Sequence, residues 1–244
     1  MHEKLRNIKI LLIIPAYNEE KNLPDLLQRI EEYTSWLDLI VINDGSKDNT
    51  IDVLRDFNIE FIDLSVNLGI GGAVQAGYRY AEKNGYDIAI QFDGDGQHPH
   101  QDIVSLVEEI LNGSDMVIGS RYIEKEGFQS TILRRLGIRC LSFLIKILTG
   151  KSISDPTSGF RACNRNIIKY FAEYYPQDYP ETETIVQLMR SKWTINEIPV
   201  RMVPRQKGVS SINLLKSIYY MFKVTLSIII GVTDGKGGGL KKYG

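Results

Sequence analysis

Short apolar runs alternate along the first 120 residues with segments in which apolar positions recur every three or four residues. The runs are rich in β-branched residues and predict buried strands, whereas the segments between them predict amphipathic helices. The predicted strands are residues 8–14, 37–43, 59–64, 87–92 and 116–119. Strands and helices that alternate at such short spacing are typical of a parallel, right-handed α/β sheet. We therefore expect an α/β protein with helices on the faces of a mostly parallel central sheet.

The alternation ends after Arg121. Residues 131–149 predict one helix with a basic start and a mostly apolar second half, and residues 155–161 predict a loop. Two short helices and a strand near residues 195–203 follow. We expect residues 1–205 to form the main domain, and residues 206–244 to form a basic loop, an amphipathic helix and a flexible tail.

Composition and charge restrict the class of protein. The 244 residues are 43% hydrophobic and 24% charged, with a net charge of −1, which is ordinary for a globular protein and argues against nucleic-acid binding. Residues 201–244 are nevertheless basic, with eight Lys or Arg and one Asp, which favours an anionic surface as a partner. Cys140 and Cys163 have no metal-ligand spacing and are expected to be reduced thiols. The first residues lack the apolar region of a signal peptide, so a cytoplasmic location is expected.

The fourth predicted strand ends on the sequence Asp93-Gly94-Asp95-Gly96-Gln97. Asp and Gly are poor strand formers, so both carboxylates should lie at the carboxyl end of the strand, where open α/β sheets bind ligands. Two carboxylates beside an amide oxygen suit Mg²⁺ or Mn²⁺, which proteins usually share with substrate phosphates. Alone, the motif is explained more simply by a polar turn that leads into a helix.

Other strand ends also carry polar side chains. The first strand leads to Tyr17 and Glu19, and the second ends on Asp44. Carboxylates accept hydrogen bonds from a nucleobase and a ribose, and a tyrosine ring packs on a base. For Asp44, a turn at the entry to a helix explains the residue equally well. A dinucleotide-binding glycine motif after the first strand and a Walker A motif are both absent from the sequence.

Six motifs occur together in a fixed order. They are Pro15-Ala-Tyr-Asn-Glu19, Asp44-Gly-Ser46, Asn67-Leu-Gly69, Asp93-Gly-Asp-Gly-Gln-His-Pro99, Gly119-Ser-Arg-Tyr122 and Ser158-Gly-Phe-Arg161. In this order the chain resembles a family 2 glycosyltransferase with the GT-A fold, over roughly residues 8–205. The strongest resemblance is to the branch of dolichyl-phosphate mannose synthases and polyprenyl-phosphate glycosyltransferases.

The resemblance implies an inverting transfer of a hexose from a nucleotide-diphosphate sugar, with a UDP-sugar favoured, that depends on Mg²⁺ or Mn²⁺. The implied acceptor is a polyprenyl phosphate or another lipid-linked molecule of cell-envelope glycan synthesis. The implied metal site contains Asp93, Asp95 and Gln97. The implied nucleotide-sugar pocket contains Pro15, Tyr17, Glu19, Asp44, Asp93 and Gly94. Arg121 matches an arginine that meets phosphate, a role that suits a guanidinium.

A catalytic base is needed if the acceptor is a hydroxyl group, but a phosphate acceptor is already an anion and needs little assistance. Asp155 matches the acidic loop of the family, and Glu183 is the alternative. A turn residue and a charge at a helix start, respectively, explain these two positions without catalysis.

Acceptor-binding candidates are basic. Relatives usually have Ser-Arg in the basic helix, and the corresponding pair here is Ile138-Arg139. Arg134, Arg135 and Arg139 are available for an anionic acceptor, although a solvated or headgroup-facing helix surface explains them almost as well. A flexible loop with Arg205, Lys207 and Ser210 is expected to close over the phosphates of donor and acceptor.

Residues 212–232 predict an apolar helix with a polar stripe, interrupted by Lys216 and Lys223 and too short in its charge-free part to span a bilayer. We expect it to lie in the membrane interface or to dock on a small membrane protein, with a core helix as the alternative. The expected location is therefore peripheral on the inner face of the cell membrane, and a homo-oligomer is compatible with the sequence.

Three other functions are compatible with parts of the pattern. A polysaccharide-extending enzyme, such as a rhamnosyltransferase, would use the same donor site with a hydroxyl acceptor. A nucleotidyltransferase would need a glycine- and lysine-rich phosphate loop that is missing after the first strand. A scaffold without activity would not need acidic residues at several strand ends.

Overall fold

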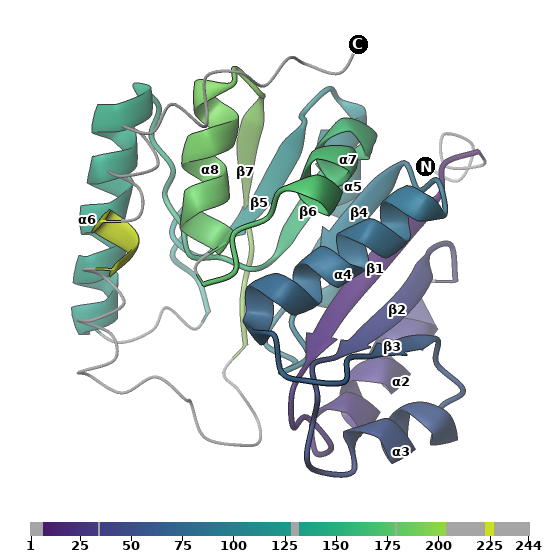
Figure 1. Cartoon of the computed structure of the whole chain (residues 1–244). Coiled ribbons are helices and arrows are strands. Elements are labelled where there is room, and N and C mark those ends of the chain that lie inside the picture. Colours follow the sequence, from purple (N-terminus) through teal and green to yellow (C-terminus); the bar gives the residue numbers. More distant parts are fainter. Residues whose placement is uncertain (1–6, 34, 128–131, 179, 204–222, 227–244) are drawn as a thin grey trace.

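In the computed structural model, residues 7–33, 35–127, 132–178, 180–203 and 223–226 are described. This part of the chain contains a seven-stranded sheet with the order β3-β2-β1-β4-β6-β5-β7 (Figure 1). The strands are β1 (Ile10–Ala16), β2 (Asp38–Asn43), β3 (Phe61–Asp63), β4 (Ile88–Gln91), β5 (Met116–Ser120), β6 (Arg161–Asn164) and β7 (Ile195–Pro199). The sheet is mostly parallel, and the predicted α/β fold is confirmed.

β1 is the centre of the sheet because every one of its seven residues is buried. It pairs in parallel with β2 on one side and β4 on the other. Its side chains alternate between two cores: Leu11 and Ile13 face one layer of helices, and Leu12 and Ile14 face the other. A continuous apolar run is the pattern expected of such a doubly covered strand.

Helices form a layer on each face of the sheet. They are α2 (Leu23–Tyr33), α3 (Thr50–Asp56), α4 (Gly69–Lys83), the 3₁₀ helix η1 (His100–Asp102), α5 (Ile103–Leu111), α6 (Ile132–Thr149), α7 (Arg165–Glu173) and α8 (Pro180–Arg190). The core on one face contains apolar residues of α4, α6, α7 and α8, and the core on the other contains residues of α2, α3 and α5. Figure 1 shows α4 and α7 side by side across the first of these faces.

β6 was not predicted, because the sequence analysis assigned its first residue to a loop. The strand has four residues, which is too short for an alternating pattern to be recognised. It runs antiparallel between β4 and β5, so its first residue, Arg161, pairs with Gln91 and Ile118 near the carboxyl ends of those strands. The reversed direction of β6 therefore carries the loop of residues 155–160 to the carboxyl edge of the sheet.

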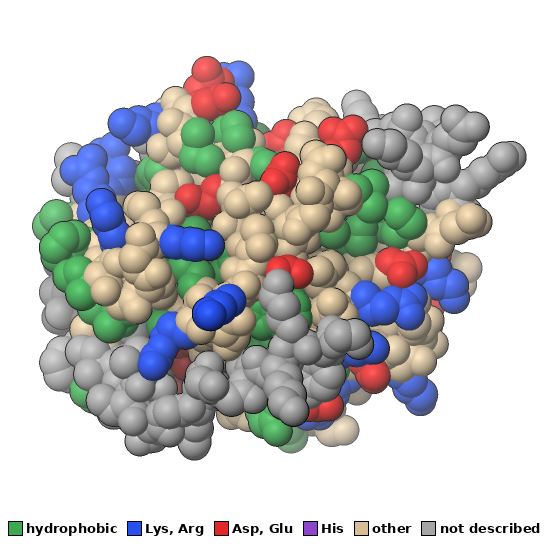
Figure 2. Space-filling view, turned by 90° about the horizontal axis from the view of Figure 1, so that it is seen from above, with side chains coloured by type: hydrophobic (Ala, Val, Ile, Leu, Met, Phe, Trp, Pro, Cys, Tyr) green, Lys and Arg blue, Asp and Glu red, His purple; other side chains and the backbone are tan. Residues whose placement is uncertain are grey.

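The predicted basic helix is confirmed as α6, which lies at the edge of the molecule (Figure 1). Figure 2 views the molecule from above and shows hydrophobic side chains beside Lys and Arg side chains at this edge. Of the predicted C-terminal helix, the structure describes only residues 223–226, which are helical. Val224 is fully buried and belongs to the same core as Leu141 and Ile145 of α6. Among the described helices, none combines the length and the apolar content that crossing a bilayer requires.

Candidate active site

A cavity of about 750 Å³ lies beyond the carboxyl ends of β1, β2 and β4. Residues at this edge that the sequence analysis assigned to the nucleotide-sugar and metal sites line the cavity together: Pro15, Tyr17, Glu19, Asp44, Asp93, Gly94 and Asp95. Among the described residues, seven Asp or Glu line the cavity, against a single Lys. Such a wall repels a diphosphate unless a cation lies between them, so the cavity is suited to a ligand that arrives with a metal ion.

The first wall of the cavity is the turn after β1. Tyr17 is 43% exposed, so its ring is accessible at the mouth. Asn18 has a left-handed backbone conformation, with φ of 56°. Its N–H donates to Ser46 Oγ at 2.9 Å, and its side-chain oxygen accepts from the Lys47 N–H at 2.8 Å. These bonds tie the turn after β1 to the turn after β2, which holds Tyr17 in place.

Asp44 is buried, and its carboxylate accepts hydrogen bonds from the start of helix α4 on the far side of the cavity. Its two carboxylate oxygens accept the N–H groups of Leu68 at 2.6 Å and Gly69 at 2.9 Å. Burial raises the pKa of Asp44, and these two hydrogen bonds oppose the shift. Asp44 thus accepts hydrogen bonds from the start of α4, 25 residues further along the chain and not from the helix that follows β2, and it also lines the cavity.

Asp93 is held by a buried histidine. His98 Nε2 lies 2.9 Å from Asp93 Oδ2, and the His98 side chain is only 4% exposed. The imidazole stacks on Phe160, with ring centroids 5.0 Å apart. Burial alone would raise the pKa of Asp93, but the adjacent His98, with Gln91, outweighs it and keeps the pKa below its ordinary value. Asp93 is therefore an anion, and the packed rings of His98 and Phe160 fix the orientation of its carboxylate.

Two glycines allow close approaches of the backbone at this edge, one of them to the Asp93 carboxylate. A Cβ on Gly159 would lie 2.9 Å from both carboxylate oxygens of Asp93. A Cβ on Gly94 would lie 3.1 Å from the carbonyl oxygen of Pro15. The first contact joins the loop before β6 to Asp93, and the second joins the turn after β4 to the end of β1.

Asp95 and Gln97 have different positions. Asp95 lines the cavity, and its Oδ1 accepts the Gln97 N–H at 3.1 Å. The Gln97 side chain donates to the Val203 carbonyl oxygen at 3.2 Å, and Gln97 does not line the cavity. The described residues contain no group of three or more His, Cys, Asp or Glu arranged as a metal cage. Two carboxylates at an open edge instead suit a metal that keeps water and substrate phosphates as its other ligands.

Arg121 and Asp155 form a buried ion pair with each other. Arg121 Nε lies 2.6 Å from Asp155 Oδ2, and Nη2 lies 2.7 Å from Oδ1. The exposed fractions of the two side chains are 8% and 0%. Burial lowers the pKa of Arg121, but Asp155 outweighs this effect and raises it. Both oxygens of Asp155 are thus occupied, a geometry that does not favour its predicted role as a base.

Glu181 is a cavity residue that the sequence analysis missed. It lines the cavity, whereas the predicted alternative Glu183 does not. Residues two apart on a helix point to different sides, and Glu181 shares its face with the buried Ile185 and Leu188. This spacing of Glu181 with two apolar residues was the signal by which the sequence could have identified it as an inward-facing carboxylate. Burial raises the pKa of Glu181, and Arg161 opposes the shift.

Arg161, which belongs to the motif Ser158-Gly-Phe-Arg161 but received no role from the sequence, is 1% exposed. Its guanidinium donates to the carbonyl oxygens of Ser158 at 2.7 Å and Pro156 at 3.3 Å, and to Thr184 Oγ1 at 3.0 Å. These bonds join the loop before β6 to α8. A buried positive charge therefore lies behind the acidic cavity.

Three of the six predicted acceptor-binding residues lie on α6. Arg134 and Arg139 are exposed, and Arg135 is half-buried. Arg134 and Arg135 both lower the pKa of Tyr122 electrostatically, against the larger effect of burial. The basic start of α6 is therefore near the residue that follows Arg121. Arg205, Lys207 and Ser210 lie outside the described residues.

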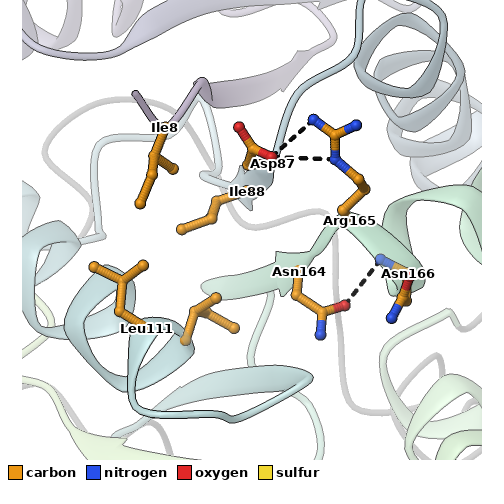
Figure 3. A pocket seen from close by; sticks show the side chains of 8 residues that line it. Ile8, Asp87, Ile88, Leu111, Asn164, Arg165 and Asn166 are labelled. Atoms are coloured by element: carbon orange, nitrogen blue, oxygen red, sulfur yellow. Dashed lines mark hydrogen bonds and ion pairs between the residues drawn. The ribbon is translucent and has the colours of Figure 1, made fainter. Parts of the chain in front are cut away.

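A smaller hollow of about 250 Å³ lies at the opposite edge of the sheet, at the start of β4 (Figure 3). Ile8, Ile88 and Leu111 line it, beside an ion pair in which Arg165 Nη2 is 2.7 Å from Asp87 Oδ1. This edge carries the amino ends of the parallel strands, so it is not the edge at which open α/β sheets bind ligands.

The mostly parallel sheet with an acidic cavity at its carboxyl edge defines an α/β protein that binds its ligand at this edge, and comparison with known families identifies the class of protein. The family model described as Glycosyl transferase family 2 matches residues 11–171, which is more than half of the chain. The chain therefore belongs to glycosyltransferase family 2.

Individual relatives indicate which members of the family this chain resembles. The UDP-N-acetylglucosamine–dolichyl-phosphate N-acetylglucosaminyltransferase of Methanococcus voltae is 32% identical over 215 residues, covering 80% of this chain and 85% of its own. The polyprenol monophosphomannose synthase of Mycolicibacterium smegmatis is 26% identical over 240 residues, covering 94% and 91%. Among solved structures, the glucosyl-3-phosphoglycerate synthase of Mycobacterium tuberculosis in complex with Mn²⁺ and UDP is similar in fold. Its TM-score is 0.69 at 18% identity, covering 100% of this chain and 84% of that one.

Proposed function

We propose that this protein is an inverting glycosyltransferase that moves a hexose from a nucleotide-diphosphate sugar, preferably a UDP-sugar, to a polyprenyl phosphate in cell-envelope glycan synthesis. The observation that carries the proposal is the cavity at the carboxyl edge, where Asp93 and Asp95 meet the Tyr17 turn. The names of the Methanococcus voltae and Mycolicibacterium smegmatis relatives, which specify dolichyl phosphate and polyprenol phosphate, support the class of acceptor.

A divalent cation, Mg²⁺ or Mn²⁺, fits the residues of this cavity. Asp95 and Asp93 would hold it, and the backbone N–H of Gln97 would orient the Asp95 carboxylate. When bound, the metal would offset the negative charge that develops on the leaving diphosphate. The Mn²⁺ and UDP present in the solved structure of similar fold support this assignment. Tyr17 would pack on the base, and Pro15, Glu19, Asp44 and Gly94 would shape the nucleotide-sugar pocket.

The bond-forming step needs no protein base if the acceptor is a phosphate, since the acceptor is already an anion. The pairing of Asp155 with Arg121 agrees with such a reaction, because the carboxylate is not available to take a proton. In this proposal Asp155 positions Arg121 toward phosphate. Arg134, Arg135 and Arg139 bind the acceptor phosphate, together with Arg205, Lys207 and Ser210.

Residues 1–205 form the transferase domain, and residues 206–244 form a segment that binds an anionic membrane surface or a membrane protein. The protein acts on the cytoplasmic face of the cell membrane as a peripheral protein.

The test is transfer of labelled sugar from UDP-glucose, UDP-N-acetylglucosamine and GDP-mannose to undecaprenyl phosphate in detergent, with and without Mn²⁺. We expect one donor to give a metal-dependent, lipid-extractable product. Asp95→Asn should lower its formation about a hundredfold, whereas replacing Asp52, an exposed carboxylate on α3, by Asn should not. Transfer only to a saccharide hydroxyl would overturn the proposed acceptor and favour a polysaccharide-extending enzyme, with Glu181 or Glu183 as the base.

A further inference from the structure

Glu197 is a half-buried carboxylate on β7, and the proposed reaction gives it no role. β7 lies at the edge of the sheet beside β5 (Figure 1), with Glu197 in register with Ile118. Glu197 shares its face of the strand with the buried Ile195, so it points toward the side of the sheet that α6 and α8 cover. Glu197 does not line the cavity. Any part that it plays in the reaction is therefore exerted through other residues.

Within the described part of the chain, the Glu197 carboxylate accepts three hydrogen bonds, all from two consecutive residues of the loop before β6. The Ser154 N–H donates to Oε2 at 2.7 Å, and the Ser154 hydroxyl donates to Oε1 at 2.9 Å. The Asp155 N–H also donates to Oε1, at 2.9 Å. Hydrogen bonds to an ionised acceptor are stronger than those between neutral groups. Glu197 thus fixes the backbone of this loop against β7.

The first connection from Glu197 to Arg121 passes through the side chain of Asp155. The carboxylate that forms the bidentate pair with the guanidinium also accepts the Arg121 backbone N–H, at 3.2 Å. Asp155 is fully buried, and Thr157 Oγ1 donates to its Oδ1 at 3.2 Å. Its side chain therefore has little freedom to compensate for a shift of its own backbone. Any such shift moves the acceptor of the guanidinium.

The second connection is a chain of hydroxyl groups with a defined direction. Ser154 Oγ lies 2.6 Å from Ser120 Oγ. A hydroxyl has one proton to donate, and Ser154 donates its proton to Glu197, since a carboxylate only accepts. Ser120 is therefore the donor to Ser154, and its own oxygen accepts the Tyr122 N–H at 3.2 Å. Ser120 and Tyr122 flank Arg121, so this chain holds the backbone on both sides of the arginine.

We infer that Glu197 is a positioning residue for Arg121. It acts through Asp155 on the guanidinium, and through Ser154 and Ser120 on the backbone that carries it. The inference rests on the proposed function, in which Arg121 meets phosphate. A guanidinium grips phosphate with two donors only when its plane is correctly directed. A misplacement of about 1 Å far from the reacting atoms is enough to lower turnover about 10²-fold.

The test is a double-mutant cycle of Glu197→Gln with Arg121→Lys, in which transfer to undecaprenyl phosphate is measured. Gln keeps the shape of the side chain, but its NH₂ group meets a donor of the loop and cannot accept from it. We expect Glu197→Gln to lower turnover about tenfold. In the Arg121→Lys protein the same change should lower turnover less than about twofold, because the bidentate group that Glu197 positions is already absent.

A merely structural role would give a different cycle. Equal losses in the two backgrounds would overturn the inference, as would unchanged turnover of Glu197→Gln. Ser154→Ala is a milder variant that removes only the hydroxyl chain and keeps both N–H donors to Glu197. It should lower turnover by a smaller factor than Glu197→Gln, and turnover equal to that of the wild type would show that this chain does not position Arg121.

Glu109→Gln is the matched control. Glu109, on α5, is also half-buried, and its Oε1 accepts from the side chain of Asn196 at 2.7 Å. Asn196 precedes Glu197 on β7 and faces the other side of the sheet. This variant therefore removes an anchor of the same strand without touching the loop, and it should keep wild-type turnover. A loss equal to that of Glu197→Gln would overturn the inference.

A measurement without turnover separates the inference from the proposed function. The Nε–H of Arg121, which donates to Asp155 Oδ2 at 2.6 Å, is followed by nuclear magnetic resonance and assigned by its loss in Arg121→Lys. Glu197→Gln should shift this resonance and Glu109→Gln should not. Normal transfer by the wild type with an unshifted resonance in Glu197→Gln would refute the inference alone. A shifted resonance in a protein whose wild type transfers sugar to no lipid phosphate would refute the proposed function and leave the positioning of Arg121 standing.

Discussion

Replacing Asp155 by Asn tests whether this carboxylate positions Arg121 or acts as a base. The change removes the negative charge that two Arg121 nitrogens contact at 2.6 and 2.7 Å, and it leaves the guanidinium buried. Removing one partner of a buried pair costs about 3–5 kcal/mol. Asn keeps one acceptor oxygen, so we expect about 3 kcal/mol. In a protein of 244 residues, this lowers the thermal midpoint by roughly 6–12 °C.

The measurement is urea unfolding followed by circular dichroism, with turnover measured on the same samples. Asp52→Asn is the matched control, because Asp52 and its partner Arg55 are both 67% exposed, and we expect a change within about 0.5 kcal/mol. The double variant Arg121→Met with Asp155→Leu has no uncompensated charge. We expect it to recover most of the stability but not the activity.

A base would behave differently. If Asp155→Asn unfolds at the wild-type urea concentration while turnover falls about a thousandfold, the ion pair is not structural. The proposal that Asp155 only positions Arg121 would then be wrong, and a hydroxyl acceptor would regain support.

Three further variants test the proposed metal site. Asp95→Asn should lower turnover about 10²-fold without changing the thermal midpoint; near-normal turnover of this variant in EDTA would contradict the metal assignment. His98→Phe keeps an aromatic ring on Phe160 but removes the nitrogen beside Asp93, so Mn²⁺ affinity measured by electron paramagnetic resonance should fall about tenfold. Gly159→Ala places a methyl group 2.9 Å from the Asp93 oxygens, so it should weaken Mn²⁺ and UDP binding in titration calorimetry; unchanged affinity would show that Asp93 is not a ligand.

Local pattern was enough to predict the parallel part of the sheet. The apolar runs that became β1 and β4 are buried in the observed sheet, and the same runs made the strands recognisable in the sequence. Asp93 and Asp95 follow β4 because Asp and Gly end a strand, and parallel strands bring such ends to one edge. The grouping of Tyr17 and Asp44 with these carboxylates was therefore predictable without coordinates.

Tertiary structure decided the features that depend on residues far apart in the chain. The pairing of Arg121 with Asp155 joins positions 34 residues apart, and both were predicted separately as functional residues. β6 was too short to recognise, yet its antiparallel insertion brings Gly159 against Asp93. The exposed face of α6 was likewise undecided, because the sequence shows that the helix is apolar but not which side the core covers. Local composition sets the conformation of a segment, whereas the neighbours of its side chains are set by how all segments pack together.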